Sequence, residues 1–203
     1  MIVIGLTGSI GMGKSTTAAM FAEDGIPVND ADAVVHDLYR AEAVEPIGEA
    51  FPGTIVEGVI DRKELSRQLA LAPDRFRELE AIVHPLVRAR EKAFLDSRRQ
   101  AGCDMVVLDI PLLFETGGEG RVDRIVVVTA DPQVQHDRVL ARPGMTEEKF
   151  AMIRARQMPD ADKRKRADFL VETDKGMDAA RRQVSDIIAT LRHEEAAGNG
   201  ELK

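Results

Sequence analysis

The sequence has little cysteine, few aromatic side chains and no excess of basic charge. Its single cysteine, Cys103, excludes an intramolecular disulfide framework and any zinc site built from several cysteines, and it is typical of a reducing compartment. Aromatic residues make up 4% of the 203 residues, which favours a soluble, helix-rich globular protein over an all-β sandwich. The formal charge of -7 opposes non-specific attraction to nucleic acid or anionic lipid, so we expect neither nucleic acid nor a membrane as a partner.

Long hydrophobic runs are also missing. No uninterrupted apolar stretch reaches the roughly 18 residues that a membrane span needs. The apolar residues from Met1 to Leu6 lack the positive region and the small-residue cleavage site of a secretory signal. We therefore interpret them as a buried strand and expect a cytoplasmic protein.

What the sequence does contain is an alternation of short β-branched runs with longer helical patterns. The strand candidates are Ile2–Leu6, Met105–Leu108, Arg124–Thr129 and Phe169–Val171, with Pro27–Val28 as a fifth. Because these runs are apolar throughout, they indicate strands that are buried on both faces. This pattern predicts an α/β fold with a doubly wound, parallel five-stranded sheet between helices.

Two helical patterns flank this predicted sheet in the sequence. The first helix begins near Lys14 and is closed by Gly25. Its side expected to be buried consists of Ala18, Phe21 and Ala22. The last helix runs from about Met177 to Arg192 and shows apolar residues at helical spacing, after which the pattern is lost.

Two further segments depart from the strand–helix alternation. Between residues 32 and 99 the strand signal nearly disappears. Arg62–Leu71 and Pro73–Arg99 read as helices, and a loop with glycine and proline precedes them near residues 52–58. We interpret this segment as a helical insertion. From Arg142 to Ala167, a helix beginning near Glu147 indicates a mobile flap, in which the basic run 163–166 fits a solvated helix face.

A phosphate-binding loop follows the first predicted strand. Residues 8–15 read Gly-Ser-Ile-Gly-Met-Gly-Lys-Ser and satisfy the pattern G-x-x-x-x-G-K-[S/T] between a buried strand and a helix. The glycines let backbone N–H groups converge on phosphate oxygens, and the helix N-terminus adds its partial positive charge. Lys14 would reach the β and γ phosphates, and Ser15 would supply a hydroxyl to Mg²⁺. The pattern therefore predicts a nucleoside triphosphate site.

The loop alone does not specify the reaction. The N-K-x-D and D-x-x-G motifs of GTP-hydrolysing switches and the L-S-G-G-Q signature of transporter ATPases are absent from the sequence, which leaves a small-molecule kinase as the natural interpretation. The four histidines show no ligand spacing, so we expect the metal to be Mg²⁺ carried by the nucleotide.

Acidic residues follow two of the predicted strands, where doubly wound sheets bind their ligands. Asp32 is a candidate base for the acceptor hydroxyl, with the alternative that Asp30 or Asp32 caps the helix continuing to Tyr39. Asp109 stands where phosphate-loop enzymes place the acid that holds Mg²⁺ or its waters. For Glu115, a solvent-facing position is the alternative to a site role.

Taken together, the sequence from Ile2 to about Ile188 resembles the dephospho-coenzyme A kinase family. The segments that carry the resemblance, in the family's order, are 7–16, 30–32, 82–87, 109–115 and 157–168. The phosphate loop is generic, whereas Asp-Ala-Asp, His-Pro and Asp-Ile-Pro-Leu-Leu-Phe-Glu are specific in combination. The resemblance implies phosphorylation of the ribose 3′-hydroxyl of dephospho-CoA by ATP, with Mg²⁺ as cofactor, to give coenzyme A and ADP.

The resemblance also implies how the chain is divided. It predicts a nucleotide-binding core of the P-loop NTPase type from residues 1–31, 100–137 and 167–195, a helical domain for the CoA substrate at 32–99, and a helical lid at 138–166. We expect a frayed tail at 196–203. The assembly is expected to be a monomer or a weak homo-oligomer.

Roles for single residues follow from the motif and the resemblance together. The predicted catalytic residues are Asp32, Lys14 and Arg138. The predicted ATP-binding residues are Gly11, Met12, Gly13, Lys14, Ser15, Thr16 and Arg142. The predicted substrate-binding residues are Thr7, Asp32, His84, Asp109 and Leu113. Ser15 and Asp109 are predicted to hold Mg²⁺, partly through water. Because His84 precedes Pro85, we expect extended geometry there and a break between helices.

The sequence departs from the family pattern in the lid and near the adenine site. Ile153 stands where many members have arginine, and Arg142 is followed by Pro143. The segment 172–176 lacks the usual asparagine-bearing turn, so we assign no adenine contact there. Two alternatives stay open from the residues: a nucleoside or nucleotide monophosphate kinase, and a nucleotide-gated binding protein without a phosphoryl acceptor.

Overall fold

The computed structural model describes the backbone of residues 1–200 and the side chains of residues 1–197. The chain forms two compact units, one made of residues 1–29 with the chain from 101 onward, and one made of residues 30–100. The segment predicted as a separate lid, 138–166, falls within the first unit.

The first unit is built on a five-stranded sheet in the order β2-β5-β1-β6-β7. The strands are β1 (Ile2–Thr7), β2 (Val28–Asp30), β5 (Met105–Asp109), β6 (Arg124–Thr129) and β7 (Phe169–Glu172). The pairings β1–β5, β1–β6 and β6–β7 are parallel. The central strands are buried at almost every position, as their continuous apolarity predicted. The predicted fold class is therefore confirmed.

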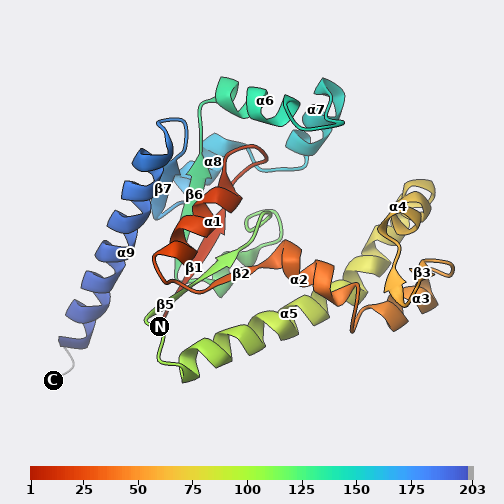
Figure 1. Ribbon diagram of the computed structural model, residues 1–203, viewed down its shortest axis with the longest axis horizontal. Helices are drawn as coiled ribbons and strands as arrows, with labels where there is room; N and C mark the ends of the chain where they lie inside the picture. Colours follow the sequence, from red (N-terminus) through yellow and green to blue (C-terminus); the bar gives the residue numbers. More distant parts are fainter. Residues whose placement is uncertain (201–203) are drawn as a thin grey trace. The chain divides into compact units, whose positions relative to one another are not determined.

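Two helices cover one face of this sheet (Figure 1). They are α1 (Lys14–Glu23) and α9 (Met177–Gly200). The shared core contains Phe21 from α1, Ile4 and Val126 from the strands, and Val184 from α9. The prediction that Ala22 is buried is wrong, because the inner face of α1 is made by Thr17, Ala18, Met20 and Phe21 instead.

The C-terminal helix is longer than expected. α9 continues past Arg192 to Gly200, so the stretch 196–200, predicted to be frayed, is helical. The last three residues of the predicted tail lie outside the described residues.

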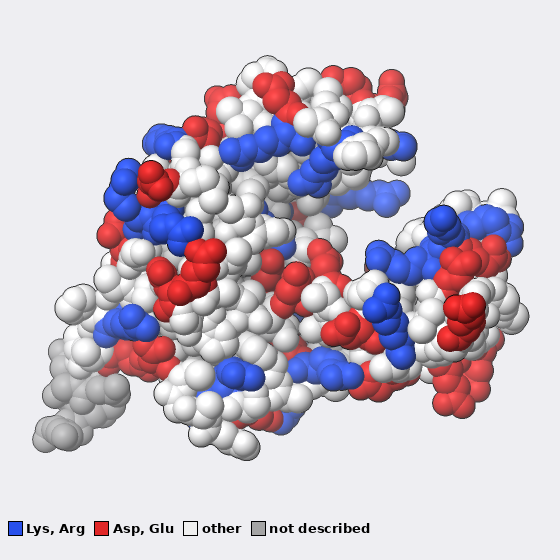
Figure 2. All heavy atoms as spheres, viewed as in Figure 1, with Lys and Arg blue, Asp and Glu red and all other residues white. Residues whose placement is uncertain are grey.

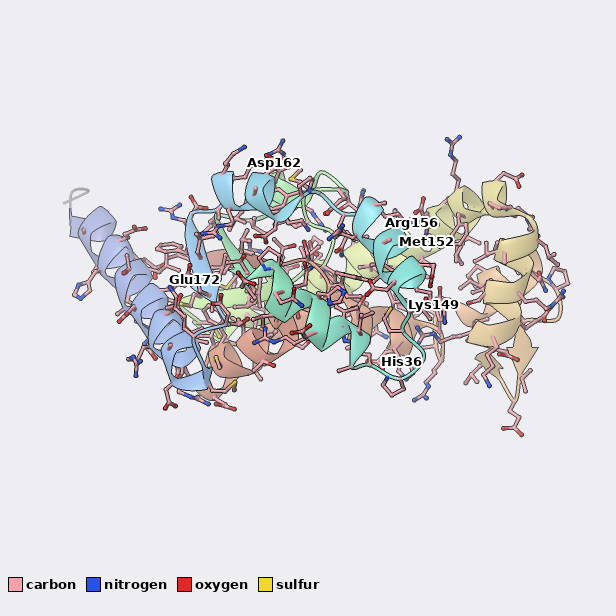
Figure 3. The ribbon with its side chains drawn as sticks, turned by 90° about the horizontal axis from the view of Figure 1, so that it is seen from above. His36, Lys149, Met152, Arg156, Asp162 and Glu172 are labelled. Carbon is pink, nitrogen blue, oxygen red and sulfur yellow. The ribbon has the colours of Figure 1, made fainter. Side chains whose placement is uncertain are left out.

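Short helices follow β5 and β6 along the chain. They are the 3₁₀ segment η2 (Gly118–Arg121), α6 (Pro132–Leu140), α7 (Glu147–Ala155) and α8 (Asp160–Lys165). Lys149, Met152 and Arg156 project from α7 and its C-cap and are exposed (Figure 3). The basic run 163–166 is not uniformly solvated as predicted, since Lys163 is completely buried while its three neighbours are exposed.

The second unit is helical, as predicted, with its own core. Its elements are α2 (Ala31–Leu38), α3 (Val44–Ala50), β3 (Ile55–Val56), β4 (Val59–Ile60), α4 (Arg62–Leu71), η1 (Pro73–Arg75) and α5 (Phe76–Gln100). Leu38, Ile47, Phe51, Leu65 and Val83 form the centre of this core. The segment expected as a loop contains an antiparallel hairpin, β3–β4.

The predicted helix break at His84 and Pro85 is wrong. α5 runs without interruption through Pro85. A proline inside a helix removes one backbone hydrogen bond and costs about 3 kcal/mol. Ile82, Val83 and Leu86, which flank it, pack in the core of the second unit and offset that cost.

Charge of both signs is spread over the surface. Figure 2 shows Lys and Arg side chains interspersed with Asp and Glu over the visible face. Within the part of the chain that the structure describes, no helix is long and apolar enough to span a membrane.

Candidate active site

The phosphate loop lies between the end of β1 and the start of α1, where the sequence predicted it. Gly11 and Gly13 have φ angles of 80° and 95°, a region that side chains with a Cβ rarely adopt. Gly13 is the N-cap of α1, so the helix begins directly with Lys14. Ser15 and Thr16 are exposed in the first turn of this helix, whereas Met12 is buried. The C-terminal half of the loop and the N-terminus of α1 therefore lie next to each other.

Lys14 is paired with an acid from the neighbouring strand. Its ammonium group donates a hydrogen bond to Asp109 Oδ1, and Asp109 is the last residue of β5. The side chains of both residues are largely buried, with 13% and 2% of their surface exposed. The parallel pairing of β1 with β5 places Leu6 opposite Asp109, and this register brings the acid to the phosphate loop. Two predicted site residues therefore lie in direct contact.

A pocket of about 290 Å³ joins the loop to two arginines from the predicted lid. Gly11, Gly13 and Thr16 line it from the loop, and Arg138 and Arg142 line it from α6 and the residues that follow. Of the predicted ATP-binding residues, this pocket brings together Gly11, Gly13, Thr16 and Arg142, which come from segments more than a hundred residues apart. Met12, Lys14 and Ser15 do not line it.

Thr173 is a member of this pocket that the sequence did not indicate. Arg138 Nη1 donates to Thr173 Oγ1 and Arg138 Nη2 to Thr173 O, both at 2.8 Å. Thr173 Oγ1 in turn donates to Met12 O in the phosphate loop at 2.8 Å. Its position directly after β7, at the carboxyl edge of the sheet, was the available signal. The threonine thus connects the guanidinium group to the loop.

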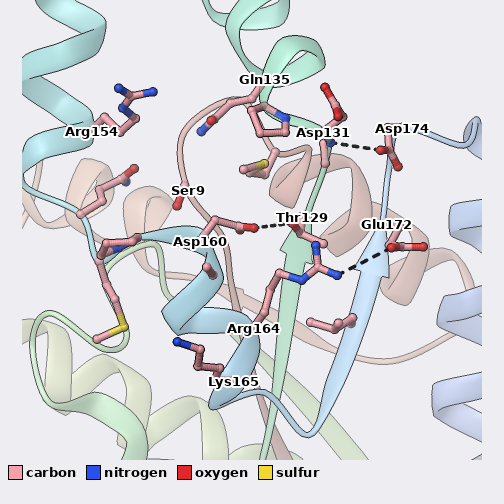
Figure 4. A pocket seen from close by; sticks show the side chains of 18 of the residues that line it. Ser9, Thr129, Asp131, Gln135, Arg154, Asp160, Arg164, Lys165, Glu172 and Asp174 are labelled. Atoms are coloured by element: carbon pink, nitrogen blue, oxygen red, sulfur yellow. Dashed lines mark hydrogen bonds and ion pairs between the residues drawn. The ribbon is translucent and has the colours of Figure 1, made fainter.

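A larger cavity of about 1080 Å³ adjoins the loop through Ser9 and Met12. It is lined by residues at the ends of β6 and β7 and by α6, α7 and α8 (Figure 4). Thr129 Oγ1 donates to Asp160 Oδ2 at 2.7 Å, and Arg164 forms an ion pair with Glu172 at 3.9 Å. Cationic and anionic side chains both line this cavity (Figure 4).

Glu115 has a structural partner and does not simply face solvent. Its Oε1 lies 2.9 Å from the buried Lys163 ammonium and accepts a hydrogen bond from Met158 N at 2.7 Å. Burial raises the pKa of this carboxyl, but the bonds from Lys163 and Met158 lower it more, so the net shift of the pKa is downward. The ion pair anchors α8 to the loop that follows β5.

Thr7 and Leu113, both predicted to contact substrate, have no exposed surface. The Thr7 hydroxyl donates to Pro111 O at 3.2 Å. Leu113 is packed close to Gly5 and Gly118. The structure therefore presents neither side chain to a ligand.

The remaining predicted residues, Asp32 and His84, belong to the second unit. Asp30 is the N-cap of α2 and accepts hydrogen bonds from Asp32 N at 2.8 Å and Ala33 N at 3.2 Å. Of the two aspartates, Asp30 therefore has the capping role, and the Asp32 carboxylate is exposed in the first turn. His84 is exposed on α5.

The donor set at the loop fits Mg²⁺ carried by a nucleotide. Mg²⁺ prefers oxygen ligands and usually keeps several waters and substrate phosphates in its shell. Ser15 offers an exposed hydroxyl, and Asp109 offers a carboxylate at the end of β5. Among the described residues, no group of three or more His, Cys, Asp or Glu side chains could hold a metal ion.

His136 forms a titratable contact between α6 and α7. Its Nε2 lies 2.8 Å from Glu147 Oε1, and its Nδ1 lies 3.4 Å from Asp137 Oδ1. The hydrogen bond with Glu147, followed by that with Asp137, raises the pKa of His136. The folded state therefore binds this proton more tightly than the unfolded state, and the imidazolium stabilises the fold at low pH.

We predict that His136→Gln lowers the melting temperature mainly at acidic pH. The difference from the unsubstituted protein should be largest at about pH 5.5, below the ordinary histidine pKa of about 6.5. It should disappear as the pH rises through the raised pKa of the folded state. Thermal unfolding across pH tests this, with His193→Gln on the exposed face of α9 as the control. An equal loss at every pH would contradict it.

The fold and the site together define a class. A parallel sheet whose first strand leads through a glycine-rich loop and a lysine into a helix, with arginines gathered over that loop, is typical of P-loop kinases. The family model for dephospho-CoA kinase matches residues 2–179. The chain therefore belongs to the dephospho-CoA kinase family, and it is a transferase.

Individual relatives agree with this membership. The chain is 62% identical to a dephospho-CoA kinase from Agrobacterium fabrum over 191 residues, which are 94% of this chain and 98% of that protein. It is 61% identical to a dephospho-CoA kinase from Rhizobium meliloti, covering 95% and 99%. The crystal structure of a Thermus thermophilus protein matches with a TM-score of 0.80 at 36% identity, covering 93% of this chain and 96% of that one.

Proposed function

We propose that this chain transfers the γ-phosphoryl group of ATP to the ribose 3′-hydroxyl of dephospho-CoA through the residues gathered at the phosphate loop. The observation that carries the proposal is the smaller pocket, in which Gly11, Gly13 and Thr16 of the loop meet Arg138 and Arg142. Phosphoryl transfer depends mainly on positioning and on neutralising the phosphate charge, and this arrangement supplies both.

On the donor side, the phosphates of ATP bind at the loop and the N-terminus of α1. Lys14 binds the β and γ phosphates, and the two arginines bind the nucleotide from the lid side. Ser15 and Asp109 would hold Mg²⁺, partly through water, and the ion would neutralise charge on the phosphates. Asp109 keeps the Lys14 ammonium at the loop through their ion pair.

On the acceptor side, Asp32 is the general base. Its carboxylate is exposed and is not used to cap α2, because Asp30 has that role. The carboxylate orients the 3′-hydroxyl and takes its proton as the new P–O bond forms. His84 is retained as a substrate-side residue only from the family pattern, whereas the fully buried side chains of Thr7 and Leu113 are not proposed to contact substrate.

In the proposed mechanism, the segment 138–166 acts as a lid over the bound nucleotide. Guanidinium groups over the transferred phosphoryl exclude water, which would otherwise hydrolyse ATP. We further propose a cytoplasmic location, an inference that rests on the single cysteine and the sequence composition. The proposed assembly is a monomer or a weak homo-oligomer.

A comparison of acceptors tests the proposed function. ADP release is measured with Mg-ATP and dephospho-CoA, AMP, CMP or adenosine at equal concentration, beside a reaction without acceptor. We expect dephospho-CoA alone to stimulate release. A better rate with a nucleoside monophosphate would favour the monophosphate kinase alternative. ADP release that no acceptor stimulates would contradict the proposal and favour a nucleotide-gated binding protein.

Thr173 offers a test of the pocket itself. Thr173→Val keeps the shape of the side chain but removes the hydroxyl that accepts from Arg138 and donates to Met12 O. Since a hydrogen bond to a charged group is worth about 1.5–3 kcal/mol, we expect kcat/KM for ATP to fall about tenfold. Thr173→Ser, which keeps the hydroxyl, should stay close to the unsubstituted enzyme. Equal kinetics for the valine and serine variants would contradict this role.

A further inference from the structure

Ile10, in the middle of the phosphate loop, is held by two glutamines from outside the loop. Ile10 N donates to Gln157 Oε1 at 3.1 Å, and Gln135 Nε2 donates to Ile10 O at 2.7 Å. Gln135 lies in α6, and Gln157 lies in the connection between α7 and α8. Figure 4 shows Gln135 at the wall of the larger cavity that Ser9 also lines. Both polar backbone groups of one loop residue are thus bound by side chains.

These bonds fix two successive peptide units. In a trans peptide unit, the carbonyl and the N–H point in opposite directions. Because the Ile10 carbonyl accepts a hydrogen bond from Gln135, the Gly11 N–H of the same peptide points away from Gln135. Gly11 itself lines the smaller pocket. The preceding unit is held at both ends, because Ser9 O accepts from Met12 N at 3.1 Å while Ile10 N is bound by Gln157.

The orientation of the Ile10–Gly11 peptide matters because its N–H end attracts phosphate and its carbonyl end repels it. Gly11 has a φ of 80°, and glycine adopts either sign of φ at little cost, so this peptide is free to flip unless it is held. A flipped peptide would turn a carbonyl oxygen toward the phosphates in place of an N–H, and attraction would become repulsion. We propose that Gln135 and Gln157 are positioning residues that keep this peptide in the orientation that binds ATP.

The segments that carry the two glutamines make further contacts within the first unit. Met158 N, next to Gln157, donates to Glu115 Oε1, which also pairs with the buried Lys163. α6 packs so closely on the loop that a Cβ added at Gly11 would lie 3.1 Å from Gln135 O. The clamp therefore connects the loop to α6 and, through Met158 and Glu115, to the segment that follows β5. It rests on the proposed function only in assuming that phosphates bind at this loop.

The opposite roles of the two glutamines provide a matched pair of variants. Gln135→Glu and Gln157→Glu have the same side-chain length and add the same charge beside the same residue. A carboxylate accepts hydrogen bonds but does not donate them. Glutamate at 157 therefore keeps the bond from Ile10 N, whereas glutamate at 135 loses the bond to Ile10 O and repels that carbonyl.

We expect Gln135→Glu to raise the KM for ATP about tenfold more than Gln157→Glu does. The KM for dephospho-CoA should be unchanged in both variants, a split that general damage to the fold would not produce. If Gln135→Glu does not fold, a second pair, Gln157→Leu and Gln157→Glu, is compared instead. Leucine cannot accept the hydrogen bond from Ile10 N, so we expect Gln157→Leu to raise the KM for ATP more than Gln157→Glu does. Equal effects within a pair, or a parallel rise in the KM for dephospho-CoA, would overturn the clamp.

Lys14→Ala separates this inference from the proposed function. If Lys14→Ala weakens ATP binding while Gln135→Glu and Gln157→Glu do not differ, the clamp alone is wrong. If Lys14→Ala also binds ATP normally, the phosphate loop is not the ATP site and the proposed function fails with it.

Discussion

Lys14→Ala is expected to lower kcat/KM for ATP about a thousandfold, the scale seen when one preorganised donor to a developing charge is removed. Lys14 is held close to the loop by its ion pair with Asp109, so its charge is in place before ATP binds. The alanine variant loses both the phosphate contact and this pre-organisation. We expect a lower kcat and a weaker affinity for ATP together, measured by steady-state kinetics and by equilibrium nucleotide binding.

The control for this variant is Lys92→Ala, which removes an exposed lysine that pairs with Asp96. It should leave the kinetics unchanged. Because Asp109 is nearly buried, loss of Lys14 also destabilises the fold. Circular dichroism at the assay temperature establishes that the variant is folded. Ordinary ATP kinetics in a folded Lys14→Ala protein would contradict the assignment of the phosphate loop.

Asp32→Asn is expected to lower kcat by a factor of about 100 to 10,000, the range for loss of a general base. Asparagine keeps the size of the side chain and its capacity for hydrogen bonding, but it does not take the proton of the 3′-hydroxyl. The affinity for ATP should stay close to its ordinary value, because Asp32 is proposed to act on the acceptor.

Asp30→Asn is the matched control for the base. Asp30 caps α2, and asparagine is as good an N-cap as aspartate, so this variant should retain both stability and turnover. A loss of turnover in Asp32→Asn but not in Asp30→Asn would show that Asp32 acts as the base and that Asp30 only caps the helix. Unchanged turnover in Asp32→Asn would show that the base is another group.

The sheet and the phosphate loop were predictable because their signals are local. β6 has the predicted bounds, Arg124–Thr129, since its β-branched run is buried on both faces. The hairpin β3–β4 was missed because each strand has only two residues. Its signal was the pair Glu57-Gly58 between apolar residues, and both residues have positive φ, as a tight hairpin turn requires.

The errors share a different cause, which is packing between residues distant in the sequence. Pro85 predicted a break, but the apolar residues around it hold α5 together. Lys163 looked like part of a solvated basic run, yet its ammonium is buried against Glu115, a partner that no spacing rule identifies. A local sequence pattern predicts the environment that a residue type has on average. Contacts with residues distant in the sequence can place it in a different environment.

The site was predictable where a motif or the family resemblance named its residues. The smaller pocket contains Gly11, Gly13, Thr16, Arg138 and Arg142, all of which were predicted. Thr173 and the two glutamines were not, because they act through contacts with backbone atoms and with Arg138. Thr173 follows β7 directly, and Gln157 begins a segment that carries the family resemblance, but neither position shows which atoms the side chain contacts.

The most direct test of the central claim is to determine the product formed from Mg-ATP and dephospho-CoA. Mass spectrometry combined with phosphorus NMR should show that dephospho-CoA has gained one phosphate and that this phosphate is a monoester on the ribose 3′ carbon. A product phosphorylated at another position, or dephospho-CoA recovered unchanged while ADP accumulates, would contradict the account.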